Sequence, residues 1–407
     1  MRRLVFVLLI GCGGGSSTPI DAAIDTRMEP LCQPVGATGQ WFRRTGNPRL
    51  VAGHQFPDAK LDISISDPSL AWDGSSWQLY YATAHGTSYT SADLAGAIRH
   101  ATAPDATTWT VDDPPALVVA SDPAAWDHVN TETPTVIENP AASPDHRFLM
   151  LYSGANGMFP GQAFANYAIG AAFSADGKTF TRVPAAQSPH GKEGLVLTGA
   201  DVYPRAAGAI VADPELALVN NLYHLWFSSY ACTGASCATV MAYGIGHATS
   251  TDGIHWTVAE APVRSLLRAS ADPTTGGGQA SVVYDAFHCR YEMWFTSDAP
   301  TDTAAQPVVF NNMAGVWHAD STDGVTWHPA FTGPRDLAWD KTATGEHLGL
   351  LTGADVADKN GARYMVYVGF DDQNVPTGFA LPDRSTLGYE PGVTTLGLAT
   401  RDATGPL

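Results

Sequence analysis

Short apolar segments alternate with turn-forming residues along the whole chain. Five of these segments are rich in aromatic residues, which favour β-strands. They begin at Trp77, Arg147, Leu222, Arg290 and Arg363. A turn signal stands before each of them, such as Asp73-Gly74 or Asn220-Asn221. Each segment is therefore predicted to form the second arm of a β-hairpin.

A second motif follows each aromatic segment and predicts a further hairpin. It combines a short apolar strand with a turn, as in Asp176-Gly177, Asp252-Gly253 and Asp323-Gly324, followed by an aromatic residue. We expect these aspartates to satisfy backbone groups of the turn. The aromatic residues recur at one place in the repeat and are expected in the core: Trp109, Phe180, Trp256 and Trp327.

A third motif opens each repeat, three times as a polar residue followed by proline. It lies at Asp67, Thr133, Asp213, Gln279 and Gly353, at intervals of 66 to 80 residues. Five repeats of two hairpins give five sheets of four antiparallel strands. The sequence therefore predicts an all-β fold, a five-bladed β-propeller, over residues 50–407. A two-sheet sandwich with accidental internal similarity is the alternative.

The charge balance narrows the range of partners. The chain has 22 Lys and Arg against 40 Asp and Glu, a net charge of −18. Such a protein repels phosphate backbones, so we expect no nucleic-acid partner. Hydrophobic residues make up 44% of the chain, which is enough for a sizeable core.

The N-terminal residues predict an exported lipoprotein. Arg2 and Arg3 precede an apolar run, residues 4–10, which is too short to span a bilayer and fits a signal-peptide core. The run ends in Leu-Ile-Gly-Cys at Cys12, which resembles a bacterial lipobox. We expect a signal peptide over residues 1–12, a flexible tether and lead-in over 13–49, and a lipid anchor on Cys12. This would hold the protein at the cell envelope, on the outer membrane or cell surface.

The four remaining cysteines predict disulfides, because an even number is typical of exported proteins. Cys232 and Cys237 are close enough in sequence to staple one loop, which leaves Cys32 and Cys289 as a second pair by elimination. A zinc site is the alternative, but no second close pair of cysteines or histidines accompanies the first.

The Asp-Pro openings, the Ser-Thr-Asp-Gly-x-x-Trp turns and the aromatic second strands together resemble the five-bladed furanosidase superfamily. This group holds glycoside hydrolase families 43, 32, 62, 68, 117 and 130, and the resemblance covers nearly all of the chain after residue 50. A propeller brings the openings of its innermost strands to one central pocket. Two or three carboxylates there are what cleavage of a glycosidic bond needs. Because a fold does not by itself give a function, the site must be argued separately.

The resemblance implies roles for three opening residues. Asp67 holds the place of a first-blade aspartate that acts as general base or as nucleophile. Asp213 holds the place of a third-blade aspartate that orients and tunes the acid. The fourth-blade residue should be a glutamate acting as general acid, but here it is Gln279, and an amide cannot donate that proton.

Three explanations for Gln279 stay open. The acid comes from elsewhere, with Glu132 at the second-blade opening as the first candidate and Asp355, Glu346 and His347 as further ones. Alternatively, the protein binds glycans without cleaving them. Thirdly, it belongs to a branch of the superfamily with a different proton route.

The predicted catalytic set is therefore Asp67, Asp213 and Glu132. Further side chains are predicted to bind substrate: Gln279, Asp355, Trp126, His128, Tyr203, Arg205 and Trp317. No cofactor is predicted, and a structural calcium or other ion in the central channel stays open.

The predicted function is that of a monomeric, surface-tethered glycoside hydrolase acting on oligo- or polysaccharides. A glycan-binding lipoprotein without catalysis is the main alternative. A purely structural surface propeller is another, and it predicts no clustered carboxylates at either mouth of the channel.

Overall fold

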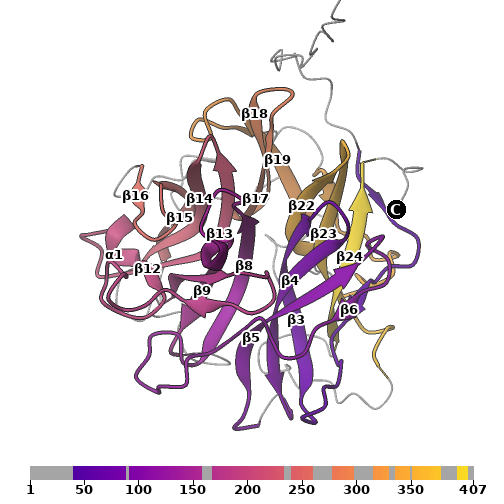
Figure 1. The fold of residues 1–407 in the computed structure, drawn as a ribbon. Helices are drawn as coiled ribbons and strands as arrows, with labels where there is room; N and C mark the ends of the chain where they lie inside the picture. The colour runs from indigo at the N-terminus through magenta and orange to yellow at the C-terminus, as the bar shows by residue number, and fades with distance from the viewer. Residues whose placement is uncertain are drawn as a thin grey trace, which may run out of the picture.

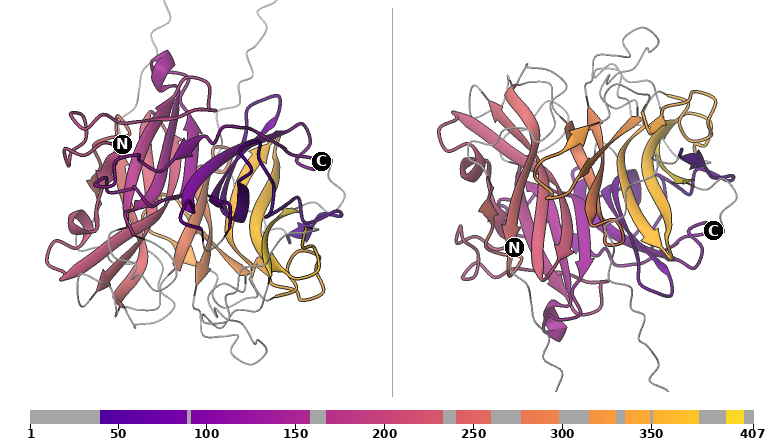
Figure 2. Two further views of the ribbon diagram at one scale, coloured as in Figure 1. Left: turned by 90° about the horizontal axis from the view of Figure 1, so that it is seen from below. Right: turned by 90° about the horizontal axis from the view of Figure 1, so that it is seen from above.

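The predicted β-propeller is confirmed. The computed structural model describes residues 40–88, 91–157, 167–232, 240–259, 277–297, 315–329, 335–348, 351–376 and 392–401. Nearly all of their regular structure is β-strand, in five separate antiparallel sheets that follow one another around the molecule (Figures 1 and 2). The exceptions are a 3-10 turn at Pro144–His146 and a short helix, α1, at Gly199–Val202.

The first three blades have the same strand order, counted outward from the axis. Blade 1 contains β3 (Leu61–Trp72), β4 (Trp77–Gly86), β5 (Ala95–Ala103) and β6 (Thr110–Val111), with β7 (Leu117–Val118) also paired to β5. Blade 2 contains β8 (Asn130–Glu138), β9 (Phe148–Ala155), β10 (Ala168–Ser174) and β11 (Thr181–Arg182), with β12 (Leu195–Leu197) paired to β10. Blade 3 contains β13 (Gly208–Val219), β14 (Leu222–Cys232), β15 (Val240–Ser250) and β16 (Thr257–Val258).

The last two blades complete the circle. Blade 4 contains β17 (Gly277–Asp285), β18 (Arg290–Ser297), β19 (Gly315–Ser321) and β20 (His328–Pro329), with β21 (Leu337–Ala338) paired to β19. Blade 5 contains β22 (Leu351–Lys359), β23 (Ala362–Asp371) and β24 (Val393–Thr400). The innermost strands contact one another in a closed ring, in the order β3, β8, β13, β17, β22 and again β3.

The N-terminal end of the described chain closes the propeller. Two short strands, β1 (Phe42–Arg43) and β2 (Leu50–Val51), pair with β24 and form the outer edge of blade 5. Arg43 makes two hydrogen bonds of 2.6 Å to the buried Glu346 carboxylate. Trp41 is buried and lies edge-on to Trp294 of blade 4, with ring centroids 5.8 Å apart. The segment expected to be a lead-in therefore supplies strands of the last blade.

The core lies between the blades. Five clusters of buried apolar side chains each join two neighbouring blades, including the pair formed by blade 5 and blade 1. The aromatic residues predicted for the core belong to these layers: Phe180 and Trp327 are buried, and Trp109 and Trp256 are partly buried against them.

The Asp-Gly turns act as predicted. Asp176 accepts hydrogen bonds from the backbone N–H groups of Lys178 and Thr179, and the turns at Asp252 and Asp323 repeat this pattern. The turns also join blades, because the Gly177 carbonyl accepts a hydrogen bond from Tyr80 of blade 1 at 2.6 Å.

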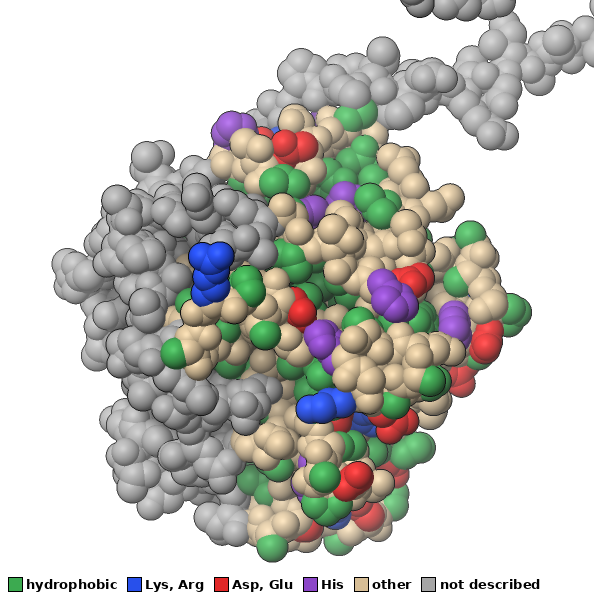
Figure 3. All heavy atoms as spheres, turned by 90° about the vertical axis from the view of Figure 1, so that its left-hand side faces the viewer, with side chains coloured by type: hydrophobic (Ala, Val, Ile, Leu, Met, Phe, Trp, Pro, Cys, Tyr) green, Lys and Arg blue, Asp and Glu red, His purple; other side chains and the backbone are tan. Residues whose placement is uncertain are grey.

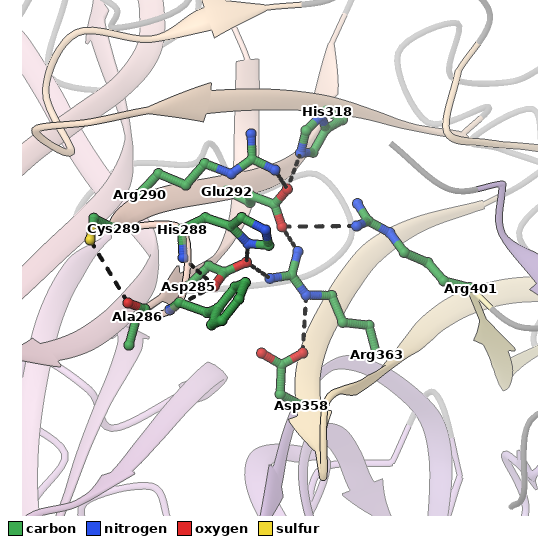
Figure 4. Close-up of polar contacts among 11 residues, drawn as sticks. Asp285, Ala286, His288, Cys289, Arg290, Glu292, His318, Asp358, Arg363 and Arg401 are labelled. Atoms are coloured by element: carbon green, nitrogen blue, oxygen red, sulfur yellow. Dashed lines mark hydrogen bonds and ion pairs between the residues drawn. The ribbon is translucent and has the colours of Figure 1, made fainter. Parts of the chain in front are cut away.

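A buried ion cluster joins blades 4 and 5 near the ends of β17 and β22 (Figure 4). Glu292 is fully buried and contacts Arg290 and Arg363 directly, with Arg401 Nη1 3.9 Å from its carboxylate. His318 Nε2 lies 3.6 Å away, and burial lowers the pKa of this histidine to about 4. Arg363 also contacts Asp285 and Asp358 at 3.3 and 3.0 Å. Glu292 thus contacts guanidinium groups from both blades at one interface.

We expect Glu292→Gln to destabilise the protein by about 3 to 5 kcal/mol, because it leaves buried guanidinium groups without their carboxylate. Urea unfolding at pH 7 would measure the change. The control is Glu138→Gln, whose carboxylate pairs with Arg147 at the surface and should change stability by less than about 1 kcal/mol. Equal changes in the two variants would contradict this account of the interface.

The predictions for the N-terminus and the cysteines lie outside the described residues, which do not include Cys12, Cys32 or Cys237. The signal peptide, the lipid anchor and the disulfide pairs therefore stay predictions. Within the described ranges, no helix is long and apolar enough to cross a membrane.

The described surface carries no large apolar patch. Its exposed large hydrophobic side chains lie on separate elements: Phe42, Val118, Phe287 and Val325. Figure 3 shows acidic and basic side chains interspersed among polar and apolar atoms on one side of the molecule.

Candidate active site

Every innermost strand carries a β-bulge at the same place. The register with the second strand shifts just after Ser66, Glu132, Ala212, Gly278 and Thr352. The next residue in each strand has a left-handed backbone, with φ between +45° and +53°: Asp67, Thr133, Asp213, Gln279 and Gly353. Only glycine adopts this conformation without cost, and such strain gathers at functional sites. A bulge bends the strand and re-aims a side chain.

The five bulge residues surround one cavity on the axis. Its volume is about 40 Å³, enough for a few water molecules, since one water needs about 10 to 15 Å³. It is lined by the bulge residues and by their neighbours Pro68, Pro134, Pro214, Glu215, Ala280, Ala354 and Asp355. Four predicted site residues therefore meet here, namely Asp67, Asp213, Gln279 and Asp355.

A second ring of polar side chains lies two residues further along each innermost strand. Each member accepts a hydrogen bond from a backbone N–H of the next blade, over distances of 2.5 to 3.3 Å. The acceptors are Ser69, Thr135, Glu215, Ser281 and Asp355, and their donors are Val136, Leu216, Val282, Val356 and Leu70. These bonds form a closed circle, so the ring fixes the positions of the bulges above it.

Three carboxylates of blades 1 to 3 influence one another electrostatically at the cavity. Burial raises the pKa of Glu132 to about 7, and the charges of Asp67 and Asp213 add to that rise. Burial, together with the Asp67 charge, also raises the pKa of Asp213 to about 7. Burial raises the pKa of Asp67 as well, against a hydrogen bond from Ser66. The predicted catalytic set thus lies within electrostatic reach of one another.

The second ring contributes two more carboxyl groups. Burial raises the pKa of Asp355 to about 6, although Ser281 donates a hydrogen bond to it at 2.6 Å. Burial and the Asp355 charge raise the pKa of Glu215 well above its usual range. Both groups are bound by backbone and hydroxyl donors, so they support the site rather than face it freely.

Gln279 lies beside Asp67. Its Oε1 accepts hydrogen bonds from Thr352 at 2.5 Å and from Thr296 at 3.4 Å, which directs the amide nitrogen the other way. That nitrogen lies 3.5 Å from Asp67 Oδ1. A neutral donor at this position favours an ionised Asp67, whereas a carboxylate would oppose it.

The aromatic residues predicted for substrate binding are placed in the core. Trp126 is 8% exposed, stacks on Tyr152 and donates its indole N–H to the Glu193 carbonyl. Tyr203 is 6% exposed and lies 3.1 Å from the Ser229 hydroxyl. Trp317 is 2% exposed in the layer between blades 3 and 4. None of the three lines the cavity, because each packs between sheets.

The remaining polar candidates also lie away from the cavity lining. His128 is bonded to the Ala120 carbonyl at 2.7 Å, and Arg205 is exposed ahead of β13. Glu346 is held by Arg43 and by the Tyr367 hydroxyl at 2.8 Å. It therefore serves the closure of blade 5.

One group of described side chains has the composition of a metal site: His347, Asp371 and Asp372, at the end of β23. Asp371 already accepts hydrogen bonds from His347 and from Asn374, as well as the backbone N–H of Gln373. These bonds engage Asp371 in a turn, whereas Asp372 is exposed.

Three residues near the carboxyl groups of the cavity were not predicted from the sequence: Glu215, Asn130 and Tyr167. Glu215 stands two residues after Asp213, as Asp355 stands two residues after Gly353, so the repeat itself held this signal. Asn130 and Tyr167 both contact Glu132. No pattern in the sequence marked either of them.

Known proteins resemble this chain in structure and not in sequence. No family model and no curated protein sequence matches the chain. A solved structure described as a glycoside hydrolase matches with a TM-score of 0.60 at 14% identity, covering 89% of this chain and 93% of that one. The chain shares that fold. A thermostable family-43 glycoside hydrolase matches at 0.53 and 13% identity, covering 83% of this chain and 89% of that one.

A family 117 glycoside hydrolase from the marine bacterium Zobellia galactanivorans matches with a TM-score of 0.55 at 13% identity, covering 89% of this chain and 90% of that one. The predicted resemblance to the five-bladed glycoside hydrolases is therefore confirmed at the level of the fold.

Proposed function

We propose that this protein is a glycoside hydrolase, with Glu132 as general acid and Asp67 as general base or nucleophile. One observation carries the proposal. Asp67 and Asp213 line one axial cavity at bulges that repeat in every blade, and Glu132, next to the Thr133 bulge, lies within electrostatic reach of both. A structural propeller has no need of such strained carboxylates at its axis.

The proposed chemistry divides the carboxyl groups by protonation state. Protonated Glu132 gives its proton to the glycosidic oxygen as the bond to the anomeric carbon breaks. Ionised Asp67 either takes a proton from the attacking water or attacks the anomeric carbon itself. Negative charge on Asp67, and to a smaller extent on Asp213, raises the pKa of Glu132, which helps the acid to hold its proton until transfer.

The proposed substrate is an oligo- or polysaccharide met outside the cell. Support for export and for a lipid on Cys12 comes from the basic start, the short apolar run and the lipobox-like cysteine. The structural similarity to glycoside hydrolases supports a carbohydrate as the substrate class.

Product analysis tests the proposal. The purified protein is incubated with a panel of α- and β-linked furanosides and pyranosides, and released sugars are measured by mass spectrometry. We expect turnover of at least one member. The control carries Asp67→Asn and Glu132→Gln together, so a contaminating hydrolase would appear as remaining activity. Equal product from both preparations would overturn the proposal.

Gln279 favours a second candidate function, the binding of glycans without cleavage. This candidate predicts saturable oligosaccharide binding by calorimetry, with the ligand recovered intact after long incubation. Recovery of cleaved sugar, absent in the double variant, would exclude it.

A further inference from the structure

We infer that Tyr167 and Asn130 are positioning residues that hold the Glu132 carboxyl and set the pH at which it titrates. The inference rests on the proposed function, in which Glu132 is the acid. Neither residue lines the cavity itself, and both reach Glu132 from the side of blade 2.

The hydrogen bonds in this group run in one direction. The Asn130 side-chain amide donates to the Tyr167 hydroxyl oxygen at 2.9 Å. The hydroxyl oxygen of Tyr167 accepts this bond, and Tyr167 is also hydrogen-bonded to Glu132. Asn130 makes a hydrogen bond to Glu132 as well. Glu132 thus accepts from two neutral donors whose orientation is fixed by their own contact.

Packing holds the two donors still. Asn130 is 1% exposed and faces Gly96 of β5, where an added Cβ would come within 2.0 Å of the Asn130 Oδ1 atom. Only glycine leaves room for Asn130 at that point. Tyr167 is 7% exposed, packs with Ile210 and Ala212 of blade 3, and accepts a hydrogen bond from Val211 on its backbone carbonyl.

Opposing effects then decide the protonation state of the acid. Burial and the carboxylates facing Glu132 from the two neighbouring blades, Asp67 on β3 and Asp213 on β13, favour the protonated form. The bonds from Asn130 and Tyr167 favour the ionised form. Removing one donor weakens the opposition to burial and charge, so it must raise the pKa of Glu132.

Tyr167→Phe isolates the hydroxyl, because the ring and its packing remain. The acid works only when protonated, so activity falls as the pH rises through the pKa of Glu132. We expect the basic limb of the kcat/KM profile to move to higher pH by about 1 unit. Tyr80→Phe is the matched control, since it removes a buried hydroxyl bound to the Gly177 carbonyl and should leave the limb in place.

A second measurement separates this inference from the proposed function. Carboxyl carbon NMR follows the titration of Glu132 directly, with its signal assigned by its loss in Glu132→Gln. The signal should titrate at higher pH in Tyr167→Phe, and also in Asn130→Ala, whether or not turnover is observed. An unchanged Glu132 titration in folded Tyr167→Phe would overturn the inference. Absence of turnover by the wild-type protein would instead count against the function.

Discussion

Glu132→Gln should lower kcat/KM by about 10² to 10⁴-fold on an oligosaccharide and much less on a nitrophenyl glycoside. A sugar alkoxide is a poor leaving group and needs the proton of Glu132, whereas a nitrophenolate leaves without one. Steady-state kinetics on matched substrates that differ only in the leaving group measures the contrast. The superfamily pattern does not place the acid at Glu132, so a loss of this size would assign that role to it.

Two results would contradict this role of Glu132. An equal loss on both substrates would mean that Glu132 does more than donate a proton. Full activity on the oligosaccharide would mean that the acid lies elsewhere. Glu138→Gln is the control, because Glu138 lies on the same strand and pairs with Arg147 at the surface.

The site differs from the superfamily pattern at the fourth-blade position, and the contacts of the residue there show what the difference does. The fourth-blade position carries Gln279, whose oxygen is held by Thr352 and Thr296, so that its nitrogen faces Asp67. An acid at that position would add a further carboxyl beside Asp67. With an amide there, the carboxyl groups Asp67, Glu132 and Asp213 lie on blades 1 to 3, and Glu132 and Asp213 both have a pKa of about 7.

Repetition made most of the fold predictable. Each hairpin carries its own turn residues and aromatic strand, so five imperfect copies revealed blades that no single copy would have shown. Equivalent positions in a closed ring must meet at the axis, so Asp67, Asp213 and Gln279 were predictable as site residues, with Asp355 close by. The edge strands β1 and β2 could not be predicted from the repeats. Two-residue strands have no hydrophobic period, and their pairing with β24 joins segments from almost opposite ends of the chain.

The aromatic residues predicted to bind substrate could not be placed correctly from the sequence. Trp126, Tyr203 and Trp317 are aromatic residues near strand ends, a pattern that suits a sugar platform and a layer between blades equally well. The tertiary packing decides between these, and it buries all three rings in the core. Tyr167 illustrates the reverse case, because it lies 35 positions after Glu132 in the sequence yet contacts it in space.

Asp67→Asn should lower kcat/KM by about 10² to 10⁴-fold on both kinds of substrate, since no leaving group can replace the group that activates water or attacks. Asp58→Asn, a carboxylate more than half exposed before β3, is the control and should have little effect. Activity restored by a nitrophenyl leaving group would contradict the role of Asp67 and assign it to the acid side of the reaction.

The same variant also tests the coupling between the carboxylates. The negative charge of Asp67 raises the pKa of both Glu132 and Asp213. Removal of this charge must therefore lower both pKa values. The basic limb of the pH profile of the remaining activity should then lie at lower pH than that of the wild type. This shift is opposite in sign to the one expected for Tyr167→Phe. Because misfolding or general loosening of the pocket has no reason to move the limb in opposite directions, the pair of variants separates electrostatic control of Glu132 from mere damage to the fold.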